Sequence, residues 1–75
     1  MTTIEGVVEL RRVNVGSKSE HDAVVLVTPE GAFTMRLEGG RPFNDPALQE
    51  LVGLTIRADG ERVAGQFIVR RYEVL

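Results

Sequence analysis

The chain has 75 residues, a net charge of −2 and no cysteine. This length suffices for one small domain over residues 1–75, and its core must be thin, because so short a chain buries only about 60% of its unfolded surface. The lack of cysteine excludes disulfides and thiolate metal sites as reinforcement. A hydrophobic content of 43% and a charged content of 27% are typical of a globular protein and exclude a disordered one.

The charge and the N-terminal sequence bear on location and partners. The start, MTTIEGVVELRR, lacks the basic and apolar regions of a signal peptide, and the longest apolar run, AVVLV at 23–27, is too short to cross a bilayer. We therefore expect a cytoplasmic protein without a membrane partner. The net charge gives no long-range attraction to nucleic acid. It leaves room for a local basic face, since eight of the nine basic residues are arginine, which suits bidentate phosphate contacts.

The first predicted element is a strand over Ile4–Val15, in which apolar and polar residues alternate. Gly6 inside this strand predicts a bend or the close approach of another backbone. The alternation slips near Arg12, where a bulge would return the following valines to the inner face. A polar loop, Gly16–Glu20, comes next. The inner face of the strand is expected to hold Ile4, Gly6, Val8 and Leu10.

A second strand is predicted over Ala23–Thr28 and a third over Ala32–Glu38, joined by a Pro-Glu-Gly turn. The AVVLV run is apolar on both faces, which is typical of a central strand or of one covered on its outer side. We expect Val24 and Leu26 to be exposed and to need a cover. In the third strand the alternating residues Phe33, Met35 and Leu37 point inward.

A short helix begins at Asp45-Pro46, because Asp caps free N–H groups and Pro is tolerated at the first helical position. About two turns are predicted before Gly53 ends the helix, and packing rather than propensity must hold them. Phe43 is positioned to fold back on the helix as a staple. The inward side is expected to carry Ala47, Leu48, Leu51 and Val52.

Two further strands are predicted, over Leu54–Ala58 and Gln66–Leu75. A turn at Asp59-Gly60 or at Ala64-Gly65 leads into the last strand, and the choice between them stays open. Both faces of the last strand carry apolar residues, so its register is open too. By simple alternation, Phe67 and Val69 share one face while Ile68, Tyr72 and Val74 share the other.

The order strand, strand, strand, short helix, strand, strand covers nearly the whole chain and resembles the OB-fold, a five-stranded Greek-key barrel. Most of the likeness lies in DPALQELVGLTIRADGERVAGQFIVRRYEVL, where a helix, a Gly stop and a closing hairpin are similar to the second half of small bacterial OB domains. The resemblance implies an all-β fold with the helix between strands three and four. It also implies a ligand surface on strands two and three and on the loop between strands one and two. An SH3-like barrel is the alternative, which this helix suits less well.

The loop VGSKSEHD at 15–22 contains the residue types of two kinds of active site. It is not a nucleotide-binding loop, because Ser17 precedes Lys18 where glycine is required and a strand rather than a helix follows. His21 has neither a second histidine nor a cysteine to complete a zinc site. Neighbouring Ser, His and Asp side chains diverge along a strand instead of converging in a pocket. We therefore expect no enzymatic activity, no metal and no cofactor.

Basic residues on the outer faces define a candidate binding surface. Arg36 and Arg57 could form a stripe with Lys18 and Arg41, and Tyr72 is the aromatic residue left for base stacking. The loop GGRPFNDP is expected to approach the loop between strands one and two. Acidic residues among the arginines can pair with them across strands. The candidate binding residues are Lys18, Ser19, Arg36, Arg41, Phe43, Arg57 and Tyr72.

Two functions from different classes follow from these patterns. The first is a non-enzymatic binding module that uses the face of strands two and three and its loops to contact a protein, including another copy of itself. The second is weak binding of single-stranded nucleic acid through the arginine-bearing face. An accessory domain of an enzyme is a third reading, which the sequence does not separate from the first.

Overall fold

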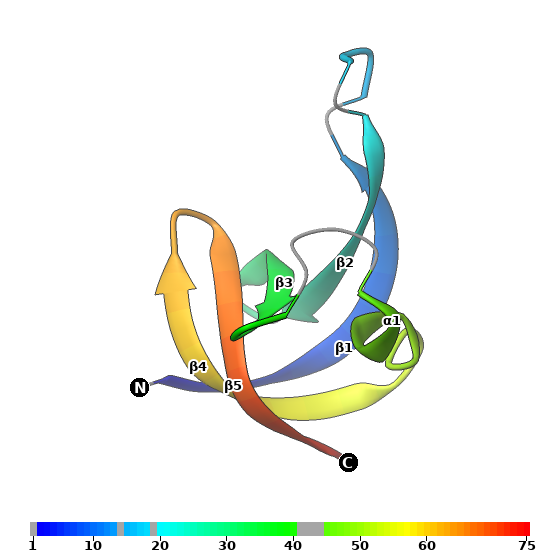
Figure 1. Cartoon of the computed structure of the whole chain (residues 1–75). Coiled ribbons are helices and arrows are strands. Elements are labelled where there is room, and N and C mark those ends of the chain that lie inside the picture. Colours follow the sequence, from blue (N-terminus) through cyan, green and yellow to red (C-terminus); the bar gives the residue numbers. More distant parts are fainter. Residues whose placement is uncertain (1, 14, 19, 41–44) are drawn as a thin grey trace.

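The computed structural model describes residues 2–13, 15–18, 20–40 and 45–75. These residues form a mostly β structure with one short helix between the third and fourth strands, in the predicted order (Figure 1). The elements are β1 (Thr2–Val13), β2 (His21–Thr28), β3 (Gly31–Leu37), α1 (Pro46–Gln49), β4 (Thr55–Val63) and β5 (Gln66–Val74). The first two strands each begin two residues earlier than predicted, and β1 also ends two residues earlier.

The five strands close into a ring in the order β1-β2-β3-β5-β4. All neighbouring strands are antiparallel except β3 and β5, which are parallel. The ring closes through β1, because residues 2–7 pair with β4 and residues 7–13 pair with β2. Gly6 lies near this change of partner, and a Cβ there would lie 2.2 Å from the Val27 carbonyl oxygen. The predicted close approach at Gly6 is therefore confirmed.

The core fills the ring. Phe67, Leu26 and Ile56 are its largest fully buried side chains, and each buried side chain of this size contributes about 1.5–3 kcal/mol. Met35 is buried as predicted, while Phe33 and Leu37 pack against the core from partly exposed positions. The buried cluster consists of Val8, Val24, Leu26, Met35, Leu48, Leu51, Ile56, Ala58, Phe67 and Val69.

The helix is shorter than predicted. The Asp45 carboxylate accepts the Ala47 N–H at 3.0 Å, which confirms the predicted cap. After Gln49 the chain continues in tighter turns, and the Leu54 N–H donates to the Leu51 carbonyl at 2.9 Å. Gly53, at φ +91°, ends this segment as expected. Because the last turn is tightened, Val52 is 38% exposed instead of lying in the core.

The hairpin of β4 and β5 decides between the two predicted turns. Its turn is Ala64-Gly65, with φ values of 48° and 81°, as a two-residue hairpin turn with two positive φ angles requires. Asp59-Gly60 instead lies within β4, which is longer than predicted. A Cβ on Gly60 would lie 1.9 Å from the Ile68 carbonyl oxygen, so glycine is needed for strand contact rather than for a turn.

A register shift in this hairpin reverses the predicted faces of β5. Gly60 lies opposite Val69, while Asp59 lies opposite Arg71, so Arg70 is the extra residue of a bulge. Tyr72 then faces Ala58, whose side chain is in the core. Tyr72 and Val74 therefore share the face of Phe67 and Val69, and the predicted opposite placement is wrong.

The far halves of β1 and β2 leave the ring as a two-stranded arm, defined here as residues 9–13, 15–18 and 20–23 (Figure 1). The pairing of these strands is continuous from Val7 opposite Val27 to Val13 opposite His21. The bulge predicted near Arg12 is therefore wrong. Leu10, predicted to point inward, is 50% exposed. Both predictions assumed that the strand faces the core along its whole length, whereas only its first half lines the ring.

Candidate functional site

The structure separates the candidate binding residues that it describes. Lys18 lies in the loop at the tip of the arm, far from β4 and β5 (Figure 1). Arg36 belongs to β3 and Arg57 to β4. Tyr72 pairs with Ala58 of β4, the residue that follows Arg57. The side chains of Tyr72 and Arg57 therefore lie on opposite faces of the sheet. Three further candidates, Ser19, Arg41 and Phe43, and the staple assigned to Phe43, lie outside the described residues.

Glu20 links the two sides of the loop at the tip of the arm. The Gly16 N–H donates to Glu20 Oε1 at 2.8 Å, and Arg12 Nη1 lies 2.7 Å from Glu20 Oε2. The Gly16 N–H, followed by the Arg12 guanidinium, lowers the pKa of the Glu20 carboxyl. The backbone donor that a phosphate group would need at Gly16 is thus already occupied. The arrangement is that of a structured hairpin loop.

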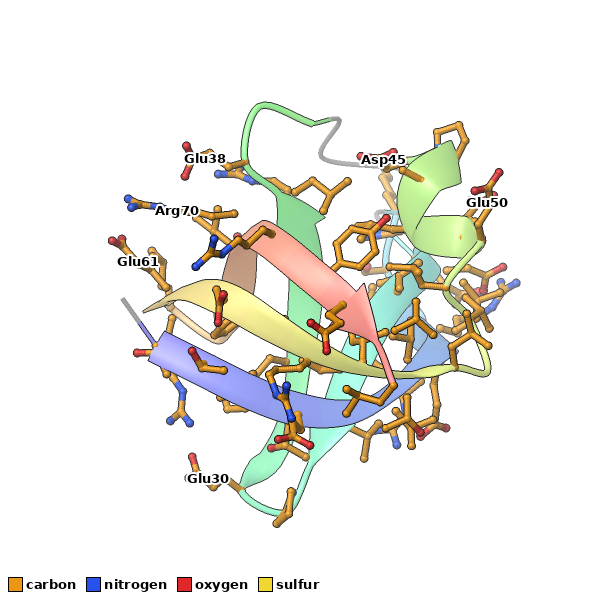
Figure 2. All side chains as sticks on the ribbon, turned by 90° about the horizontal axis from the view of Figure 1, so that it is seen from below. Glu30, Glu38, Asp45, Glu50, Glu61 and Arg70 are labelled. Atoms are coloured by element: carbon orange, nitrogen blue, oxygen red, sulfur yellow. The ribbon has the colours of Figure 1, made fainter. Side chains whose placement is uncertain are left out.

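The arginines of the ring are mostly neutralised by their neighbours. Arg57 lies between Glu5, at 3.3 Å, and Glu73, at 3.6 Å. Arg70, the bulge residue, lies 2.9 Å from Glu38 and 3.2 Å from Glu61 (Figure 2). These pairs are exposed, so each contributes little to stability, but each reduces the positive potential available to a phosphate backbone.

Most of the basic residues that the structure describes are paired with acidic residues. The sequence has nine basic residues, and leaving out Arg41, which lies outside the description, gives eight. Six of the eight form ion pairs with acidic residues: Arg11, Arg12, Arg57, Arg62, Arg70 and Arg71. Lys18 and Arg36 form none within the described part of the chain. They lie on the arm loop and on β3, so they do not define a continuous stripe.

Asp59 is the centre of a second cross-strand row on the outer face. Thr3 Oγ1 donates to Asp59 Oδ1 at 2.5 Å, and Arg71 Nε lies 2.9 Å from Asp59 Oδ2. The Thr3 hydroxyl, followed by the Arg71 guanidinium, lowers the pKa of the Asp59 carboxyl. The row joins β1, β4 and β5 and lies next to the row of Glu5, Arg57 and Glu73.

The face of β2 and β3 does not present the predicted apolar surface. Leu26 is 0% exposed and Val24 is 9% exposed, and both belong to the core. The expectation that these two side chains need an external cover is therefore wrong. Ala23 and Val25 lie on the opposite face of β2 and are also buried, outside the main core cluster. Both faces of this strand are therefore buried. This agrees with the other interpretation of the run, a central strand that is covered on both sides.

Exposed apolar residues lie instead on chain segments that meet at one end of the ring, in a group that we call the apolar rim. The Val8 backbone pairs with Leu54 and Gly53, and the Leu75 N–H donates to the Thr55 carbonyl at 2.9 Å. These bonds bring the end of the helical segment, the start of β4 and the end of β5 to the stretch of β1 that precedes Leu10. The apolar rim consists of Leu10, Val52, Leu54, Tyr72, Val74 and Leu75, which are 38–51% exposed.

Sequence reasoning found one member of the apolar rim, Tyr72, and missed the others. The sequence pattern predicts Leu10 and Val52 to face the core, because both fall on apolar faces. They are exposed because their segments extend beyond the end of the ring. A local sequence pattern does not indicate where the ring ends. The Val74 side chain joins the rim because of the bulge at Arg70.

Neither metal-binding groups nor related proteins add a site. Within the described residues, no three His, Cys, Asp or Glu side chains are placed to hold a metal ion. In the same part of the chain, no helix is long and apolar enough to cross a membrane. No family model, no curated protein and no solved structure matches this chain.

Proposed function

We propose that this protein is a non-enzymatic, protein-binding module of OB type that uses the apolar rim to associate, in the first instance with a second copy of itself. Support for the fold type comes from the strand order, the parallel β3–β5 pair and the helix between β3 and β4, which are features expected of such a barrel. The fold type alone does not give a function, so the proposal depends on the surface.

The observation that carries the proposal is the concentration of half-exposed apolar side chains at one end of the ring. Val74 is 49% exposed and Leu75 is 51% exposed, while most charged side chains elsewhere pair within the chain. Exposed apolar residues concentrated in one region mark interaction sites on small soluble proteins. The location differs from the predicted face of strands two and three, because the apolar residues of that face are buried.

Analytical ultracentrifugation over a range of protein concentrations tests the proposal. We expect the apparent mass to rise with concentration for the natural sequence. Val74→Asp should hold the protein monomeric, whereas Val63→Asp should not. Val63 is a matched control, since it is 46% exposed and lies beside the turn at the other end of the same hairpin. A strict monomer at every concentration would refute self-association.

Binding of single-stranded nucleic acid is the competing outcome. It requires free basic groups, and the ion pairs of six arginines speak against it. A labelled oligonucleotide that binds at low salt and is released steeply as salt rises would overturn the assignment to protein binding. Amide shifts in the same titration would map the contact face, and shifts at Arg36 and Lys18 would identify the predicted basic surface.

A further inference from the structure

Within the part of the chain that the structure describes, the C-terminal half of β5 has an open edge. The parallel pairing of β5 with β3 ends at Val69, where the Glu38 N–H donates to the Val69 carbonyl at 2.8 Å. Beyond that point β5 pairs with β4 alone, and no other described strand lies along it (Figure 2). A strand edge of this kind presents unpaired N–H and C=O groups to another strand.

The direction of these backbone groups follows from the ladder with β4. The Leu75 N–H donates to the Thr55 carbonyl at 2.9 Å. Because hydrogen-bonded pairs alternate in an antiparallel ladder, Arg71 and Glu73 also direct their backbone groups toward β4. Tyr72 and Val74 consequently direct theirs toward the open edge. Their side chains, 41% and 49% exposed, lie beside that edge on the core-facing side.

The outer face beside this edge carries two rows of opposite charge pattern. One row runs from Glu5 through Arg57 to Glu73, with separations of 3.3 and 3.6 Å, and ends in a negative charge at the edge. The neighbouring row runs through Asp59 to Arg71, at 2.9 Å, and ends in a positive charge. Arg71 and Glu73 are the two end members, and their side chains are 79% and 68% exposed.

We propose that two copies of this chain pair antiparallel through their β5 edges, with Tyr72 of one copy opposite Tyr72 of the other. This inference rests on the proposed self-association and specifies its surface and register. In this register the Tyr72 N–H of each copy donates to the Tyr72 carbonyl of the other. This pairing uses the backbone groups that Tyr72 directs toward the open edge. The contact is two-fold symmetric, so each patch meets its own copy.

Charge selects this register over its neighbours. With Tyr72 at the centre, Arg71 of each copy faces Glu73 of the other, so the two rows join into one alternating series across both sheets. Centring the pair on Glu73 places glutamate against glutamate, and centring it on Arg71 places arginine against arginine. Like charges directly opposite each other are destabilising, whereas opposite charges stabilise a strand pair.

A charge-swap mixing experiment tests the register. Arg71→Glu alone puts Glu against Glu73 of the second copy, and Glu73→Arg alone puts Arg against Arg71. Each variant should therefore dimerise at least about tenfold more weakly than the natural chain. An equimolar mixture of the two variants makes both cross-copy pairs opposite in sign, so it should form a heterodimer. Misfolding of either variant could not be repaired by mixing.

Matched controls change the same charge elsewhere. Lys18→Glu, at the tip of the arm, and Glu30→Arg, in the turn between β2 and β3, should leave dimerisation unchanged, because both side chains are exposed and neither residue belongs to β5 or to the apolar rim. If the natural chain dimerises but the mixture of charge-swap variants stays monomeric, the register is wrong and self-association stands. If the natural chain is monomeric throughout, both proposals fail together.

Cysteine cross-linking provides an independent readout, since the chain has no cysteine of its own. A hydrogen-bonded antiparallel pair holds its Cα atoms about 5.5 Å apart, which a disulfide spans. Tyr72→Cys should form a disulfide-linked dimer readily under mild oxidation. Val63→Cys, at a similarly exposed position, should not. Equal cross-linking of the two variants would overturn the proposed pairing.

Discussion

The arm continues two strands of the ring, β1 and β2, but different forces hold the two regions. In the ring, side chains such as Val8 and Leu26 are fully buried, and the strand pairs share one apolar core. Toward the tip of the arm the main side-chain contacts are exposed, such as the ion pairs of Arg12 with Glu20 and Asp22. Isolated two-stranded hairpins are marginal, and exposed ion pairs add little. Strand pairing alone therefore does not make a region stable, and the arm should open locally before the ring unfolds.

The largest effect is expected from removing a core side chain of the ring. Phe67 is 0% exposed, so Phe67→Ala should lower the free energy of unfolding by about 3–5 kcal/mol, enough to unfold much of a small domain. Leu10→Ala on the arm removes a half-exposed side chain and should cost less than about 1 kcal/mol. Urea unfolding followed by circular dichroism measures both. Similar midpoints for the two variants would contradict the distinction between ring and arm.

The next largest effect is expected at the glycine where β1 changes partner. Gly6→Ala places a Cβ 2.2 Å from a backbone oxygen of β2, so the free energy of unfolding should fall by about 1–3 kcal/mol. Gly16→Ala on the arm meets no atom within 4 Å, but its φ of +84° strains alanine by about 1 kcal/mol. Hydrogen exchange should show a loss of amide protection in the ring for Gly6→Ala and in the arm for Gly16→Ala. Damage confined to the arm in Gly6→Ala would contradict the role given to this close approach.

A gain in stability is expected at the turn of the β4–β5 hairpin. Ala64 has a φ of 48°, a region that glycine and asparagine adopt more easily than alanine. Ala64→Asn should therefore raise the free energy of unfolding by about 1 kcal/mol. The same urea experiment measures it. An unchanged or lower midpoint would mean that Ala64 is not strained in this turn.

The smallest effect is expected from acid, and it should appear in the arm first. The Gly16 N–H and Arg12 lower the pKa of Glu20 in the folded protein. The stabilisation is therefore complete above the ordinary pKa of glutamate and is lost as the pH falls through the lowered pKa. Exchange of the Gly16 amide, corrected for its intrinsic pH dependence, should lose protection in this range while ring amides stay protected. Glu20→Gln should abolish this pH dependence, and an unchanged profile would contradict the assignment.

The sequence predicted most of the fold because its signals are local. The alternation in Phe33, Met35 and Leu37, the Asp45 cap and the Gly53 stop each act within a few residues, and each is confirmed. The candidate site was less predictable. Pairing of Arg57 with Glu5 joins residues 52 positions apart, so a surface read from the arginines alone overstates its free positive charge.

By itself, the sequence determined the all-β class, the order of the elements and the glycine at the close approach, since these depend on period, capping and backbone sterics. Only the tertiary structure decided where the ring ends. The strand that holds Val8 in the core continues past the ring to expose Leu10, and a one-residue bulge returns Tyr72 to the core-facing side. Burial depends on which strands lie alongside, and that is a property of the closed ring rather than of any one segment.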